Sequence, residues 1–157
     1  MPLAMSADAS GEFGPGVFGL TGDVARGVSR MLLDLGYSPL LEFCLPSGRR
    51  VDVAAISDAG DIVAVEIKVS LADFRADGKW PEYLEYCDRY YFAVPDGFPH
   101  EVLPDAHGLI VADKFGAAIV REGTHSPITA ARRKSLLIRF ARTAAERFAR
   151  AADPFAP

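Results

Sequence analysis

A pair of short apolar runs separated by a five-residue turn constrains the fold of this 157-residue chain more than any other feature. Residues 50–56 and 62–68 are rich in β-branched side chains, which favour strands over helices. Between them, Gly60 suits the left-handed position that ends a three-residue hairpin loop. The sequence therefore predicts an antiparallel hairpin near the middle of the chain.

The register of this hairpin decides where its charged side chains lie. A loop that ends at Gly60 places Asp52 directly opposite Glu66. Because side chains alternate along a strand, Lys68 follows Glu66 on the same face. Two carboxylates in this arrangement lie roughly 5 Å apart and repel each other unless a cation compensates them. Mg²⁺ binds carboxylate oxygens together with waters and phosphate, so the pattern predicts a divalent metal site.

Glu42 extends this row of carboxylates. A second turn with glycine last, at residues 46–48, sets Glu42 opposite Asp52, which makes Glu42 a secondary ligand for the metal or for a water. The alternative is a partly solvated glutamate that pairs with Arg49 or Arg50. For the hairpin as a whole, the alternative is an exposed sheet edge with an ordinary acid–lysine pair, because an acid-x-lysine tripeptide is common by chance.

The composition fits one globular domain. Half of the residues are hydrophobic, and the net charge of −4 carries no general nucleic-acid signature. Two cysteines are too few for a disulfide framework or a zinc cluster. The sequence lacks a secretory signal and a run long enough to cross a bilayer, so we expect a cytoplasmic protein with no membrane partner, associated with the nucleoid when bound to DNA.

The domain boundaries follow from changes in composition. Residues 1–20 are rich in Gly, Ala, Ser and Pro and are predicted to form a flexible N-terminal arm. Residues 21–152 form the single predicted domain, and residues 153–157 form a short tail. Between residues 127 and 157, seven basic residues against two acidic ones give a local charge of +5, which can serve phosphate binding in an acidic protein.

Patterns along the domain predict a mixed α/β fold. Apolar spacing indicates a helix over residues 21–36, and the three-strand meander follows it. Ser126 as cap and Pro127 as first residue predict a long basic helix that ends near Ala151. We therefore expect a central mixed sheet flanked by helices, with two short helices after the meander, then a strand at residues 90–94, a closing hairpin at residues 108–121 and the terminal helix.

This plan, with an acid in the second strand and an acid-x-lysine in the third, resembles the PD-(D/E)XK (restriction-endonuclease-like) superfamily over residues 21–94. The resemblance implies a restriction-endonuclease-like core with Asp52, Glu66 and Lys68 at the catalytic positions. Arg50-Val51 stands here where most members have a proline before the first acid.

A longer set of residues carries a second similarity: Glu66-Ile67-Lys68-Val69-Ser70, Asp73-Phe74, Lys79-Trp80-Pro81-Glu82-Tyr83, Cys87-Asp88 and Tyr91-Phe92-Ala93-Val94-Pro95. This set resembles the bacterial MmcB-like family, which is associated with DNA repair and resistance to cross-linking damage. This closer resemblance runs from about Thr21 to the last helix. It implies a repair role, and a nuclease activity is inferred from the same motif.

Several side chains around the motif are candidate DNA contacts, each with a structural alternative. A phosphate or a stacked base would suit those that follow the motif strand, and a DNA backbone would suit the basic ones. In the alternatives, the arginines before Asp52 balance the acidic patch, the tryptophan packs as a hydrophobic staple, and the terminal basic residues solubilise the outer face of their helix. The candidates are Arg49, Arg50, Lys79, Trp80, Arg132, Arg133 and Lys134.

The leading hypothesis is a Mg²⁺- or Mn²⁺-dependent DNA endonuclease or nickase that acts on damaged or branched duplex DNA. Asp52 and Glu66 bind the metal, the carbonyl of Ile67 is a further ligand, and Lys68 supports the attacking water. One alternative is a non-cleaving DNA-binding adaptor that recruits repair-protein partners, and another is a ribonuclease. The sequence identifies neither an oligomeric state nor the number of metals.

Overall fold

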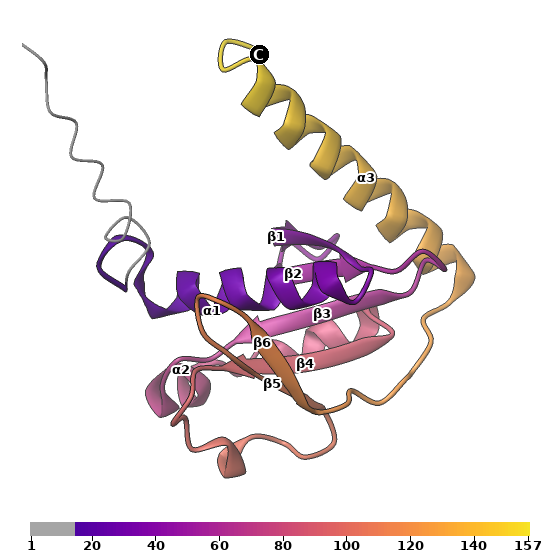
Figure 1. The fold of residues 1–157 in the computed structure, drawn as a ribbon. Coiled ribbons are helices and arrows are strands. Elements are labelled where there is room, and N and C mark those ends of the chain that lie inside the picture. The colour runs from indigo at the N-terminus through magenta and orange to yellow at the C-terminus, as the bar shows by residue number, and fades with distance from the viewer. Residues whose placement is uncertain (1–14) are drawn as a thin grey trace, which may run out of the picture.

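A six-stranded mixed sheet organises residues 15–157, the part of the chain that the computed structural model describes. The strands lie in the order β1-β2-β3-β4-β5-β6 (Figure 1). Two short 3₁₀ elements, η1 and η2, accompany the helices. The elements in chain order are α1 (Pro15–Asp34), β1 (Ser38–Cys44), β2 (Arg50–Ile56), β3 (Ile62–Ile67), α2 (Leu71–Ala76), η1 (Trp80–Tyr86), β4 (Arg89–Val94), η2 (His100–Val102), β5 (Gly108–Ala112), β6 (Ala117–Arg121) and α3 (Ala130–Ala152).

The strand directions bring charged residues that are distant in the sequence to one end of the sheet. β1, β2 and β3 form an antiparallel meander, β3, β4 and β5 run parallel, and β6 returns antiparallel to β5. Because β2 runs against β3, the start of β2 lies beside the end of β3. The predicted mixed α/β fold, with its meander, closing hairpin and long terminal helix, is confirmed.

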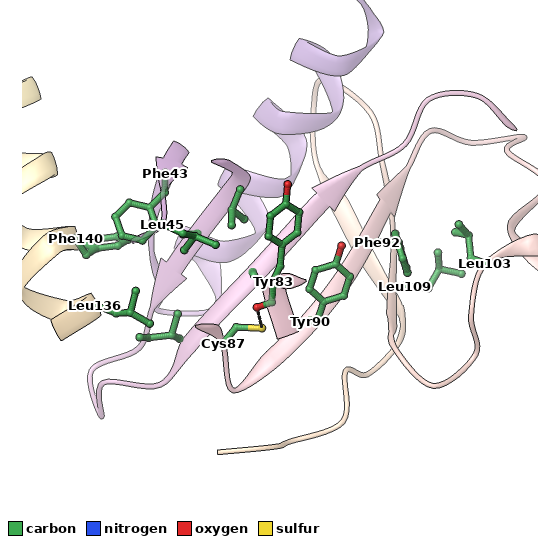
Figure 2. Close-up of a cluster of buried hydrophobic side chains, with 14 of the residues drawn as sticks. Phe43, Leu45, Tyr83, Cys87, Tyr90, Phe92, Leu103, Leu109, Leu136 and Phe140 are labelled. Carbon is green, nitrogen blue, oxygen red and sulfur yellow. Dashed lines mark hydrogen bonds between the residues drawn. The ribbon is translucent and has the colours of Figure 1, made fainter. Parts of the chain in front are cut away.

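Two hydrophobic clusters form the core, one on each face of the sheet. On one face, Val24 and Val28 of α1 pack against β2 to β5, and both valines are fully buried. Figure 2 shows residues of the cluster on the other face, where Leu136 and Phe140 of α3 pack near Phe43 of β1. Burial of each such large side chain contributes about 1.5–3 kcal/mol, so both layers fix the sheet between them.

The β2–β3 hairpin has the register that its turn predicts. Ile56 pairs with Ile62 and Ala54 pairs with Ala64. Gly60 adopts a φ of 86°, as expected for the last residue of the loop. The positions of Asp52 and Glu66 therefore lie opposite each other when this pairing is continued.

The β1–β2 register is also as predicted, but the predicted pair of Glu42 with Asp52 is absent from it. The pairs on either side are Leu41 with Val53 and Phe43 with Val51, whereas Glu42 adopts a φ of 50° and belongs to no pair. A positive φ is uncommon in a residue other than glycine and breaks the regular alternation of side chains. Leu40 and Phe43, three residues apart on either side of the break, accordingly both pack in the same hydrophobic cluster.

The first helix begins earlier than the sequence predicts. α1 starts at Pro15, not near Thr21, and Gly19 interrupts it with a φ of 70°. Residues 15–20, predicted as part of the arm, therefore belong to this element, and glycine at position 19 accommodates the kink between its two helical segments. The remainder of the predicted arm, residues 1–14, lies outside the described residues.

The terminal helix begins later than predicted. Thr129, rather than Ser126, is its N-cap, and the Thr129 side chain accepts a hydrogen bond from the N–H of Arg132 at 3.3 Å. The N–H of Ser126 instead donates to the carbonyl of Asp88, and the N–H of Ile128 donates to the Asp88 carboxylate. These tertiary bonds hold residues 126–128 outside the helix, so Thr129, three residues further on, caps it.

Candidate metal and nucleic-acid site

The acidic and basic residues of the predicted motif gather where β2 begins and β3 ends. Asp52 is half-buried near the start of β2, and Glu66 near the end of β3 is only 6% exposed. Lys68 follows β3 directly and is 4% exposed. The carboxylate of Asp52 accepts a hydrogen bond from the N–H of Ile67 at 2.7 Å, which ties the two strand ends together.

The two carboxylates lie in each other's electric field. Burial, followed by repulsion from Asp52, raises the pKa of Glu66 to about 8, although Lys68 opposes the shift. Burial also raises the pKa of Asp52, against the N–H of Ile67 and the charge of Lys68. The Oε2 atom of Glu66 is buried and has no hydrogen-bond partner. The site therefore holds two carboxylates beside one ammonium, which is itself paired with Asp77, and one buried carboxylate oxygen has no donor.

Lys68 has a partner that the sequence analysis missed. Its Nζ lies 2.6 Å from Oδ2 of Asp77, which is in the loop after α2. Burial raises the pKa of Asp77, but the hydrogen bonds from Lys68 and from the N–H of Lys79 outweigh it and lower that pKa below its usual value. An aspartate before a glycine in a turn is ordinary loop chemistry, so the sequence carried no signal for this pairing.

The turn between β3 and α2 fixes the position of Lys68. Ser70 caps α2 by accepting the N–H of Asp73 at 3.1 Å. The carboxylate of Asp73 in turn accepts the N–H of Val69, also at 3.1 Å. The N–H of Lys68 itself donates to the carbonyl of Ala93 in β4 at 2.9 Å. This backbone is therefore held by hydrogen bonds on both sides of the lysine.

A cleft of about 320 Å³ gives access to Asp52. It lies between α1, the irregular part of β1 and the second half of α3. Glu42 lines this cleft together with Asp52, and its side chain is exposed. The lining residues are Thr21, Gly22, Ala25, Leu41, Glu42, Asp52, Ile67 and Arg147.

Arg147 is the basic residue of this cleft, and no local sequence pattern predicts its place there. It donates hydrogen bonds from Nη1 to the carbonyl of Leu41 and from Nη2 to the carbonyl of Glu42, the latter at 2.8 Å. Arg147 lies 106 residues after Leu41 and 105 residues after Glu42 in the sequence. A contact of that range leaves no trace in local sequence patterns.

Among the predicted DNA contacts near the motif, two have partners within the protein. Arg49 forms an ion pair with Glu82 at 2.8 Å on the surface. Trp80 packs against core aromatic rings, with centroid distances of 5.8 Å to Tyr90 and 5.1 Å to Phe92, and this contact favours the packing alternative for Trp80. Arg50 and Lys79, which complete this group, are exposed.

The first basic residues of α3 form contacts within the protein that the sequence does not predict. Arg132 donates to the carbonyl of Glu85 at 2.9 Å and lies over the ring of Tyr86. Arg133 makes two hydrogen bonds of 2.6 Å to the carboxylate of Asp88. Lys134 is exposed. Of these three, Lys134 is the residue whose side chain points to solvent without a recorded partner among the described residues.

A second acidic group lies at the opposite end of the sheet. Asp61, Asp88 and His125 offer ligand atoms within 4.8 Å of one another, so a metal ion fits this triad geometrically. Asp88, however, already accepts hydrogen bonds from the N–H groups of Ile62 and Ile128 besides its pair with Arg133. Burial raises the pKa of Asp88, but the bonds from Arg133 and the two N–H groups lower it below its usual value.

The chain is similar to a family of known proteins and to a solved structure. The family described as DNA repair protein MmcB-like matches residues 20–155. A solved structure, the SPO1766 protein of unknown function from Silicibacter pomeroyi, has 44% sequence identity and a TM-score of 0.84, and the match covers 86% of this chain and 92% of that one. No curated protein matches. Within the described residues, no helix is long and apolar enough to cross a bilayer.

Proposed function

The chain belongs to the family of MmcB-like DNA repair proteins, and we propose that it serves repair as a Mg²⁺- or Mn²⁺-dependent endonuclease or nickase acting through Asp52, Glu66 and Lys68. The observation that carries this proposal is the buried Oε2 atom of Glu66, which has no hydrogen-bond partner beside a second carboxylate. A protein gains nothing in stability from such an arrangement, so a ligand that compensates it is the simplest reason for its presence.

A divalent metal fits the residues at this end of the sheet. Asp52 and Glu66 supply hard oxygen ligands, and the carbonyl of Ile67 is a further candidate. A bound Mg²⁺ or Mn²⁺ would polarise a phosphate and lower the pKa of a bound water. Glu42 lines the same cleft and serves in this proposal as a secondary ligand for the metal or a water.

Lys68 contributes charge next to the carboxylates. Its attraction opposes the raised pKa of both Asp52 and Glu66, which places the ammonium close to them. Because Asp77 holds the ammonium at 2.6 Å, we assign Lys68 to orienting the attacking water and to stabilising negative charge on the phosphorus centre, rather than to removing a proton. Asp77 acts through Lys68 and is a positioning residue.

DNA is the proposed substrate because the family acts in DNA repair. The resemblance to the PD-(D/E)XK superfamily supports a phosphodiesterase reaction and stays a prediction. A non-cleaving adaptor would have no use for a buried carboxylate repelled by a second one, which favours the enzyme over that alternative.

The test is cleavage of supercoiled plasmid with Mg²⁺ or Mn²⁺. We expect the native protein to nick or linearise the plasmid, and Asp52→Asn and Lys68→Met each to reduce the rate about 100-fold or more. Asp61→Asn removes a carboxylate from the other acidic group and should leave the rate unchanged.

The outcomes separate the proposal from its alternatives. Equal cleavage by the native protein and by Asp52→Asn would refute the assigned site. DNA binding without cleavage in either metal would identify the adaptor, and faster cleavage of an RNA of the same sequence would identify a ribonuclease. Circular dichroism of each variant verifies that the fold is intact.

A further inference from the structure

Helix α3 connects the two ends of the sheet. At its start, Arg133 bonds both Asp88 and the carbonyl of Gly60 in the β2–β3 turn. Arg147 follows fourteen residues later, roughly 21 Å along a helix that rises about 1.5 Å per residue. A six-residue strand spans about 20 Å, so this length carries Arg147 from the Asp88 end of the sheet to the Asp52 end. Figure 1 shows the rest of α3 extending beyond the sheet.

The charge of Arg147 is not compensated at that position. Its two recorded hydrogen bonds go to neutral carbonyls, those of Leu41 and Glu42. Among residues 15–157, no carboxylate lies within ion-pair distance of Arg147, whereas Arg133 is paired with Asp88. A guanidinium has five N–H donors, so Arg147 retains donors for a ligand while the carbonyls fix its orientation.

Arg147 shares its cleft with Asp52 and Ile67. The guanidinium and the proposed metal-binding carboxylate therefore face the same space of about 320 Å³. A guanidinium binds phosphate oxygens in a planar, two-pronged geometry. A phosphodiester is the ligand that matches both a divalent metal and an arginine in one cleft.

A purely structural role for Arg147 is the competing explanation. β1 is an edge strand, and hydrogen bonds to its carbonyls protect such an edge from pairing with another chain. That role requires donors at Leu41 and Glu42 but no free charge beside Asp52. The two explanations differ in what they predict for nucleic-acid binding.

We propose, as an extension of the proposed nuclease function, that Arg147 binds a DNA backbone phosphate next to the scissile bond. The carbonyls of Leu41 and Glu42 preorganise its guanidinium for this contact. The second half of α3 then contacts the substrate. Arg132 and Arg133 at the start of the helix do not, because they form hydrogen bonds within the protein.

The test is the binding of a labelled DNA duplex, measured by fluorescence anisotropy with EDTA present over a range of salt concentrations. Arg147→Gln should weaken binding about 5- to 10-fold and reduce the slope of log affinity against log salt by about 1. Arg147→Lys keeps the charge and should bind within about 2-fold of the native protein. Arg139→Gln, an exposed arginine of the same helix outside the cleft, is the matched control and should also stay within about 2-fold.

Each outcome decides the proposal. An unchanged slope for Arg147→Gln in a folded protein, or an equal loss for Arg139→Gln, would overturn it, as would the absence of DNA binding by the native protein. The binding assay does not depend on cleavage. If the native protein shows no nuclease activity but Arg147→Gln still reduces the salt slope, the nuclease proposal is refuted and the phosphate contact stands. Cleavage by the native protein with normal binding by Arg147→Gln would refute this inference alone.

Discussion

The two ends of the central sheet each hold a buried carboxylate, and the two carboxylates differ in their partners and in the direction of their pKa shifts. At one end, Asp88 is 1% exposed and is paired with Arg133 and two backbone N–H groups, so its pKa is lowered. At the other end, Glu66 is 6% exposed beside Asp52, with one oxygen unpaired and a pKa raised to about 8. Arg133 compensates the charge of Asp88, whereas Oε2 of Glu66 has no hydrogen-bond partner.

This difference separates a structural ion pair from a candidate binding site. Asp88, directly before β4, accepts hydrogen bonds from Ile62 at the start of β3 and from Arg133 of α3, so its bonds hold three parts of the fold together. Glu66 holds nothing comparable, and its ionised form destabilises the protein until a cation compensates it. Acidic side chains near one another are therefore informative only when their existing partners are known.

The largest expected effect is the loss of the structural carboxylate. Asp88→Ala leaves Arg133 without its partner and two N–H groups without an acceptor, and we expect it to reduce the free energy of unfolding by about 3–5 kcal/mol. Denaturation in urea measures this directly. A loss below about 1 kcal/mol would contradict the role given to Asp88.

Replacement of the other carboxylate should have the opposite sign. Glu66→Gln removes the charge and its repulsion of Asp52, so at pH 8 without metal we expect the free energy of unfolding to rise by about 1–3 kcal/mol. Urea denaturation in EDTA measures it, and Glu82→Gln on the surface is the control. A variant less stable than the native protein would mean that ionised Glu66 stabilises the fold.

The pH dependence follows from the same shift. The pKa of Glu66 is raised by folding, so its contribution to stability is present at low pH and is lost as the pH rises from 4.5 through about 8. Metal binding needs the ionised form, so the increase in Tm on adding Mn²⁺ should grow over this range. A constant increase between pH 6 and pH 8.5 would argue against Glu66 as the ligand.

The smallest expected effect concerns Glu42. Its positive φ strains the backbone, and glycine adopts that conformation freely, so Glu42→Gly should raise the free energy of unfolding by up to about 1 kcal/mol. If Glu42 is a secondary ligand, the same variant should also weaken Mn²⁺ binding several-fold, as calorimetry can measure. Unchanged affinity would remove Glu42 from the site.

The sequence predicts those parts of the fold and site that local geometry determines. Gly60 fixes the loop, the loop fixes the register, and the register brings Asp52 and Glu66 to facing positions. It could not predict Asp77 or Arg147, because their contacts depend on how a loop and a distant helix pack. The local signal of Pro127 favours Ser126 as the cap of the last helix, but the hydrogen bonds of Asp88 hold residues 126–128 outside the helix and Thr129 caps it instead.

The most direct test of the contrast between the two ends is calorimetric titration of Mn²⁺ into the native protein, Asp52→Asn and Asp61→Asn. Asp52 belongs to the uncompensated end, and Asp61 belongs to the triad with Asp88 and His125. The expected result is binding by the native protein and by Asp61→Asn, with none by Asp52→Asn. Binding that survives in Asp52→Asn and disappears in Asp61→Asn would place the metal at the other end and contradict the account.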